Sequence, residues 1–192
     1  YLNQNNKIER STEVILDPST LWIDLVNMSR EEEKLIENFL GIDIPSKEEM
    51  EQIEVSRRLY VENDATYFIM SLINHNLTSI INHSVTFILS NNVLITVRYN
   101  EELTSFNSFG PKLVKNQNNY FESKEIFLEL LTIIIETLAD ILQDVRQNID
   151  KLNREIFLTD TSAEEKTNYA EVLKKIGQQG NFLSKTEESI LS

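Results

Sequence analysis

Hydrophobic and polar residues in the first half of the chain alternate with the two-residue period of β-strands. The predicted strands are residues 12 to 17, 21 to 25, 59 to 64, 65 to 73, 84 to 90 and 93 to 99. Asn91 and Asn92 separate the last two, and both residues tolerate the left-handed backbone of a tight hairpin. Because several strands are apolar on both faces, helices are expected on both sides of the sheet. The pattern predicts an α/β fold, an α/β/α sandwich with a mixed sheet of about six to seven strands.

Two capping signals mark helices between these strands. Ser29 and Glu32 form a capping box that opens a helix, and Gly41 is placed to end it in a left-handed conformation. Ser46 and Glu49 form a second box, which opens a short helix that continues to residue 53. The acidic residues in these first turns are favourably placed near the positive ends of the helix dipoles.

The second half of the chain has the 3.6-residue period of long amphipathic helices. One apolar stripe consists of Phe127, Leu131, Ile134, Leu138, Ile141, Val145, Ile149, Leu152 and Ile156. After Thr159 to Thr161, Ser162 and Glu165 are expected to cap a second helix. Its apolar stripe is Tyr169, Leu173, Ile176, Leu183 and Ile190. These patterns predict an α/β domain over residues 1–122 and a long antiparallel helical hairpin, packed on it, over residues 123–192.

Composition narrows the chemistry that these elements can carry. The 192-residue chain has a formal net charge of −13, which disfavours nucleic acid as a partner and favours cations. Its glycines, at 41, 110, 177 and 180, cannot form a phosphate-binding or dinucleotide-binding loop. No cysteine is present, and the two histidines, His75 and His83, lack the spacing of a zinc site. Without a nucleophile elbow or a catalytic triad pattern, the chain is not expected to be an enzyme.

The candidate ligands for a cation are carboxylates at two places. Glu62 and Asp64 lie at a predicted strand end and turn, whereas Glu136, Asp140 and Asp144 lie on the polar side of the first long helix. Oxygen ligands of this kind suit Mg²⁺. The ordinary alternative is that these side chains are solvated surface charges, which require no bound ion.

Several segments, taken together, resemble the cytoplasmic domain of the CorA family of divalent-cation transporters. They are L-W-I-D-L at 21 to 25, L-G-I-D-I-P at 40 to 45 and E-E-M-E-Q-I-E-V-S-R-R-L-Y-V-E at 48 to 62, followed by the strand pairs. The resemblance extends over most of the chain, including the acidic helical hairpin. Zinc-transporting members of the family are similar as well.

The resemblance implies a function for the chain as part of a membrane protein. Family members are homopentamers in a cell membrane, and regulatory ions bind carboxylates between neighbouring cytoplasmic domains. The chain lacks the family's Gly-Met-Asn signature and membrane helices, so it is expected to be the cytoplasmic regulatory part. The implied ion, both transported and regulatory, is Mg²⁺, with Co²⁺ or Zn²⁺ as alternatives, and no organic cofactor is expected. The competing interpretation is an acidic adaptor whose hairpin binds partner proteins without sensing ions.

Overall fold

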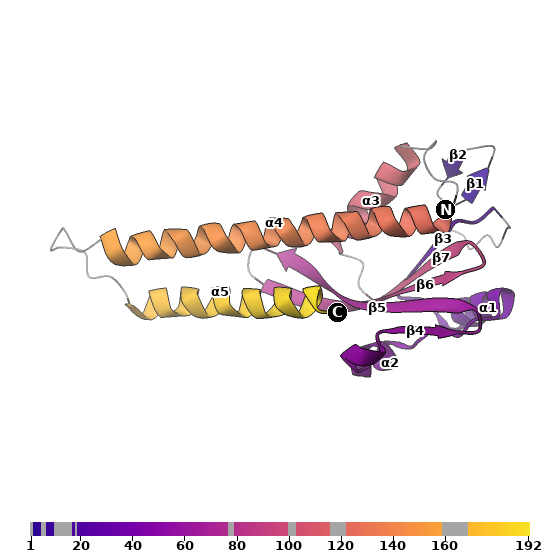
Figure 1. The fold of residues 1–192 in the computed structure, drawn as a ribbon, viewed down its shortest axis with the longest axis horizontal. Helices are drawn as coiled ribbons and strands as arrows, with labels where there is room; N and C mark the ends of the chain where they lie inside the picture. Colours follow the sequence, from indigo (N-terminus) through magenta and orange to yellow (C-terminus); the bar gives the residue numbers. More distant parts are fainter. Residues whose placement is uncertain are drawn as a thin grey trace.

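A five-stranded sheet forms the centre of the computed structural model, and two long helices extend away from it (Figure 1). The structure describes residues 2–4, 7–9, 17, 19–76, 79–99, 103–115, 122–158 and 169–192. The strands of the sheet are β3 (Trp22–Val26), β4 (Leu59–Glu62), β5 (Ala65–Asn76), β6 (Ser79–Ser90) and β7 (Val93–Arg98). A separate antiparallel pair is formed by β1 (Leu2–Gln4) and β2 (Lys7–Glu9).

The order of strands in the main sheet is β3-β7-β6-β5-β4, with β3 parallel to β7 and all other pairs antiparallel. The predicted mixed α/β class is therefore confirmed. The sheet has five strands in the described part of the chain, fewer than the six to seven expected. The strand expected at residues 12 to 17 falls almost wholly outside the described residues.

Two tight hairpins hold the antiparallel strands in register. Asn91 and Asn92, between β6 and β7, have φ angles of 46° and 64°. Asn63 and Asp64, between β4 and β5, have φ angles of 48° and 58°. Positive φ at both central residues is the geometry that matches the twist of antiparallel strands, and Asn and Asp adopt it more readily than most residues.

One face of the sheet is covered by α1 (Arg30–Leu40) and α2 (Lys47–Gln52). Both predicted capping boxes are present, and Gly41 ends α1 at a φ of 67°. The buried residues of this layer are Leu25, Ile36, Ile42, Ile44, Met50, Ala65, Tyr67, Ile88, Val93, Ile95 and Val97. A one-turn 3-10 helix, η1 (Val55–Arg57), connects α2 to β4.

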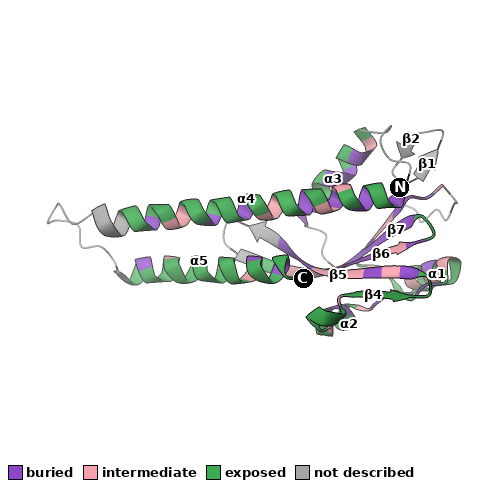
Figure 2. Cartoon of the chain, viewed as in Figure 1, coloured by how far each residue is buried: buried purple, intermediate pink, exposed green. Residues whose placement is uncertain are grey.

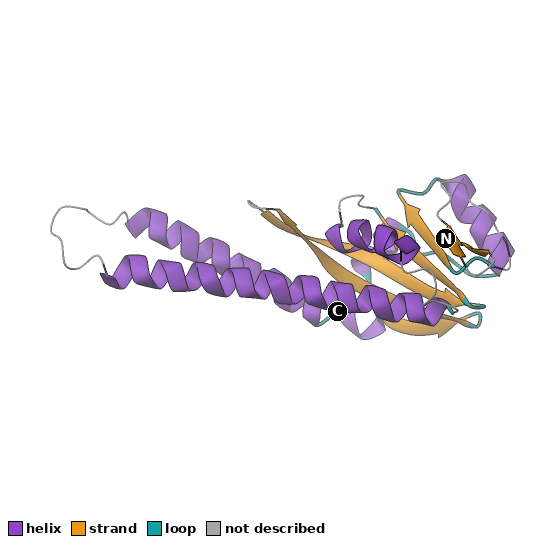
Figure 3. Ribbon diagram, turned by 90° about the horizontal axis from the view of Figure 1, so that it is seen from above, coloured by secondary structure: helices purple, strands orange, loops and turns teal. Residues whose placement is uncertain are grey.

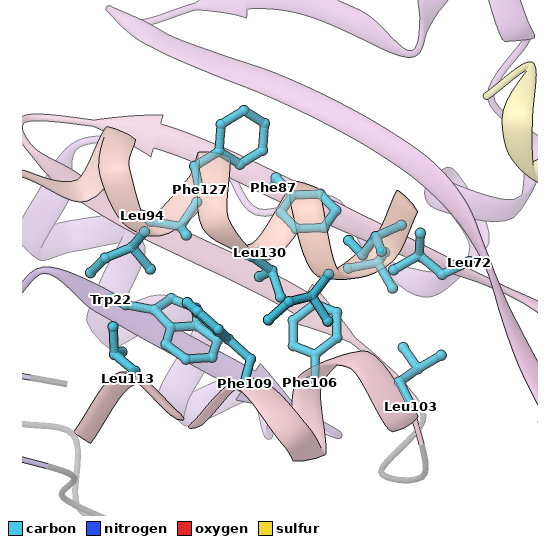
Figure 4. Close-up of a cluster of buried hydrophobic side chains, with 14 of the residues drawn as sticks. Trp22, Leu72, Phe87, Leu94, Leu103, Phe106, Phe109, Leu113, Phe127 and Leu130 are labelled. Atoms are coloured by element: carbon cyan, nitrogen blue, oxygen red, sulfur yellow. The ribbon is translucent and has the colours of Figure 1, made fainter. Parts of the chain in front are cut away.

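The opposite face is covered by α3 (Thr104–Lys115) and the first part of α4 (Ser123–Leu158), as Figure 4 shows. Trp22 packs against Phe109 with ring centroids 5.3 Å apart, and Phe127 of α4 lies edge-on to Phe87 at 5.6 Å. The sequence pattern did not predict α3, because Gly110 and Pro111 disfavour the interior of a helix. The helix forms nonetheless, since Phe106, Phe109 and Leu113 share one face that is buried in this core.

The second long helix, α5 (Tyr169–Ile190), runs back alongside α4 (Figures 1 and 3). The apolar stripe predicted for α4 faces inward, with Phe127, Ile134, Ile141, Val145 and Leu152 buried. The stripe predicted for α5 does not: Leu173, Ile176, Leu183 and Ile190 are all exposed. The cap expected at Ser162 and Glu165 and the helix end at Thr159 to Thr161 lie outside the described residues.

Candidate metal-binding carboxylates

Glu62 and Asp64 lie at the hairpin between β4 and β5. Glu62 is the last residue of β4, and Asp64 is the second residue of the turn; both are exposed. Side chains alternate between the faces of a strand, so Glu62 is on the same face as Tyr60. Tyr60 belongs to the core under α1 and α2, which places Glu62 at the edge of that layer.

The pKa of Tyr60 is affected by the negative charge of Glu62. The ring of Tyr60 stacks on the ring of Tyr67 with centroids 4.6 Å apart, and the Tyr67 hydroxyl donates to the Asp43 carbonyl at 2.8 Å. Burial, the neighbouring Tyr67 and the charges of Glu62, Asp43 and Glu49 together raise the pKa of Tyr60 to about 12, and burial is the largest cause. The same carboxylates that destabilise a phenolate there would favour a cation at this edge.

Glu136, Asp140 and Asp144 lie on α4 and are exposed. Their spacing of four residues places them on successive turns along one side of the helix. None of the three has an ion-pair partner within 4.0 Å in the part of the chain that the structure describes. By contrast, Glu129 of the same helix is paired with Lys112 of α3 at 2.6 Å.

The two groups of carboxylates lie on different layers of one molecule. Glu62 faces the layer of α1 and α2, whereas α4 packs on the opposite face of the sheet. Among the described residues, no three His, Asp or Glu side chains are grouped closely enough to hold a metal ion. The two groups of predicted ligands are therefore exposed carboxylates at separate places on one copy of the chain.

Sequence reasoning missed a buried polar network that links β3, β7 and α3. The Arg98 guanidinium donates two hydrogen bonds to the Asp24 carboxylate, from Nε at 3.1 Å and from the terminal nitrogen at 2.8 Å. The Thr96 hydroxyl donates to the same carboxylate at 2.8 Å, and Trp22 Nε1 donates to the Thr96 hydroxyl at 2.9 Å. The Arg98 guanidinium also lies 4.9 Å from the centre of the Phe106 ring.

Register explains why these side chains meet. In the parallel pair β3 and β7, Asp24 lies opposite Thr96 and Val26 lies opposite Arg98, so all of the polar groups share one face. A signal was present in the sequence, since W-I-D-L places one charged residue, Asp24, and T-V-R places a polar and a charged residue, Thr96 and Arg98, in strands that are otherwise apolar. A half-buried carboxylate with a two-point arginine partner holds elements in place and is not free to bind a cation.

The fold is a mixed α/β domain from which a pair of long helices projects, and the chain is strongly acidic. The family model described as CorA-like Mg²⁺ transporter protein matches residues 17–191. The chain therefore belongs to the CorA-like Mg²⁺ transporter family.

Curated relatives agree with this assignment. The magnesium transport protein CorA of Wolinella succinogenes is 33% identical over 144 residues, which is 72% of this chain and 44% of that protein. The magnesium transport protein CorA of Campylobacter jejuni is 27% identical over 184 residues, or 91% of this chain and 55% of that protein. The chain thus spans about half the length of these relatives.

Two solved structures share the fold at low sequence identity. The full-length CmaX protein has a TM-score of 0.62 at 13% identity, over 96% of this chain and 58% of that chain. The CorA magnesium transporter of Methanocaldococcus jannaschii has a TM-score of 0.53 at 13% identity, over 94% of this chain and 72% of that chain. Among the helices that the structure describes, none is both long enough and apolar enough to cross a membrane.

Proposed function

We propose that this chain is the cytoplasmic regulatory domain of a CorA-family transporter of Mg²⁺, in which divalent ions bind between neighbouring copies. Family membership supports Mg²⁺ as the transported ion, and the net charge of −13 supports a response to cations. In the proposed pentamer, residues 1–122 form the sensing domain and residues 123–192 form the hairpin that transmits its position. Co²⁺ and Zn²⁺ are alternative ions for the same oxygen ligands.

The observation that carries this proposal is the arrangement of exposed carboxylates in partial sets. Glu62 with Asp64, and Glu136 with Asp140 and Asp144, offer oxygen ligands that are not used in ion pairs between described residues. Mg²⁺ keeps several waters and needs only one or two carboxylates, so ligands from two copies would complete a modest-affinity site. Bound Mg²⁺ would offset repulsion between acidic copies, and its loss would let them separate.

Native mass spectrometry and thermal unfolding of the 192-residue chain, each with and without millimolar Mg²⁺, test the proposal. We expect Mg²⁺ to shift the mass distribution toward higher oligomers and to raise the unfolding midpoint, because a ligand that binds only the folded state stabilises it. A variant with Glu136→Gln, Asp140→Asn and Asp144→Asn should lose most of both responses.

The matched control removes the same number of negative charges at other exposed positions. Glu31→Gln, Glu48→Gln and Glu54→Gln together remove three negative charges from exposed positions outside the proposed ligand sets. This control should keep the Mg²⁺ response. If both triple variants respond equally, general charge screening explains the effect; if the parent chain does not respond at all, the acidic adaptor becomes the better interpretation.

A further inference from the structure

The helix α5 contacts the rest of the molecule through a mostly polar face. Its buried or half-buried side chains are Val172, Lys175, Gln179, Phe182, Lys185, Thr186 and Ser189. Of these, only Val172 and Phe182 are apolar, and among the side chains described from residue 170 to 190, Val172 is the only apolar one that is buried. Figure 2 shows the resulting contrast, with α5 exposed along most of its length.

Two of these polar groups are buried without a hydrogen-bond partner. They are the Gln179 side-chain oxygen and the Ser189 hydroxyl. The side-chain oxygen of Asn82, on the strand β6 that α5 contacts, is buried and unsatisfied as well. A buried polar group without a partner has lost its hydrogen bonds to water and gained none, so these groups oppose the burial of this surface.

The apolar stripe of α5 lies beside the contact face and not on it. At 100° per residue, Ile176, Leu183 and Ile190 lie about a quarter turn away from the centre of the buried face. All three are exposed. An added Cβ at Gly177 or Gly180 would meet nothing within 4 Å, so no neighbouring backbone packs closely there. The apolar part of the attachment of α5 comes instead from Phe182, which packs against the cluster of Ile73 and Ile141, and from the buried Val172.

A few hydrogen bonds at its C-terminal end connect α5 to the sheet. Asn82 Nδ2 donates to the Glu188 carboxylate at 2.7 Å and to the Lys185 carbonyl at 3.4 Å. The Ser71 backbone N–H donates to the Ser192 hydroxyl at 3.0 Å. We call these three contacts the α5 latch.

The position of the latch explains why it is needed. The Ile69 N–H on the outer edge of β5 donates to the Arg58 carbonyl at the start of β4. Because alternate N–H groups point to the same edge of a strand, the Ser71 N–H lies on that edge where β4 no longer pairs with it. Ser192 satisfies this donor in place of a strand.

From these contacts we infer that α5 is a releasable arm: it detaches from the β5–β6 ribbon by breaking the latch, while α4 stays anchored in the core. This inference does not depend on ion sensing. It assigns the movable element of the domain to α5, because α5 is attached through the latch and a small apolar contact of Phe182 with the cluster of Ile73 and Ile141, whereas α4 is held by a large buried core.

Native-state hydrogen exchange of the 192-residue chain, read by mass spectrometry, tests the inference. We expect the amides of α5 to exchange at least about tenfold faster than those of α4 between residues 126 and 141, where the helix packs on the sheet. Asn82→Ala and Ser192→Ala should each speed exchange in α5 by about two- to tenfold, because each removes one or two of the hydrogen bonds of the latch. Exchange in α4 should not change.

Ser192→Ala makes the experiment decisive even if Asn82→Ala disturbs β6, because it removes only a hydroxyl group, which accepts from the Ser71 N–H and donates to the Ser189 carbonyl. Asn107→Ala, at an exposed position on α3, is the control for a surface asparagine. Equal exchange of α5 and the packed turns of α4 overturns the inference. So does an α5 rate that neither latch variant changes, or a change that spreads equally to both helices.

Discussion

α4 and α5 lie side by side, but they bury different kinds of side chain (Figure 2). Between residues 126 and 152, α4 buries eight apolar residues: Ile126, Phe127, Leu130, Ile133, Ile134, Ile141, Val145 and Leu152. By contrast, the described side chains of α5, from residue 170 onward, include one buried apolar residue and two buried hydroxyl residues, Val172, Thr186 and Ser189. Hydrophobic burial scales with apolar area removed from water, so α4 belongs to the core and α5 is attached to it. Similar helical propensity thus does not give two helices the same stability.

Truncating one leucine in each helix tests this comparison most strongly. Leu130 on α4 is fully buried, so Leu130→Ala should lower the free energy of unfolding by about 2 to 5 kcal/mol through lost burial and a cavity. Leu183 on α5 is 42% exposed, and Leu183→Ala should change the free energy of unfolding by less than about 1 kcal/mol. Urea denaturation of both variants measures the difference. Comparable losses would mean that α5 is as firmly packed as α4.

The two glycines of α5 offer a smaller test in the opposite direction. Gly177→Ala and Gly180→Ala should each stabilise the helix by about 1 kcal/mol, because an added Cβ meets no neighbour within 4 Å. Hydrogen exchange within α5 should slow accordingly. Ala170→Gly, at an exposed position of the same helix, is the matched control and should speed hydrogen exchange within α5. Slower exchange in α4 as well would indicate that the two helices open together.

The smallest expected effect is a pH dependence at the end of α5. Burial, with the nearby charges of Lys47 and Lys185, lowers the pKa of His83. The folded state therefore disfavours the imidazolium, so the unfolded state binds more protons, and stability should fall as pH drops below about 6.5 through the folded pKa. Thermal unfolding between pH 7.5 and 5.5 measures this dependence.

His83→Gln removes the titrating group, so the unfolding midpoint should depend less on pH between pH 7.5 and 5.5. Carboxylates with ordinary or lowered pKa values remain ionised there, as expected for Glu32 and Glu49, whose pKa values are lowered by hydrogen bonds from Ser29 and Ser46. If the unfolding midpoint depends on pH equally in the parent chain and in the variant, His83 is not the source of that dependence.

Local chemistry in the sequence determined much of the fold. The capping residues Ser29 and Ser46, the helix-ending Gly41 and the Asn91-Asn92 turn act through bonds and backbone angles within a few residues, so their predicted roles are confirmed. The two-residue and 3.6-residue periods likewise identified β5, β6, β7 and α4, because each element must bury one or both faces. The acidic character of the surface follows from composition alone.

Tertiary structure decided which of the amphipathic faces is used and which polar groups meet. The apolar stripe of α5 is a sound helical pattern, yet the latch at Asn82 and Ser71 holds the helix with a different face inward. The pairing of Asp24 with Arg98 depends on the register between strands more than 70 residues apart. Periodicity specifies that a face exists, whereas its partner is set by long-range packing, which no local pattern encodes.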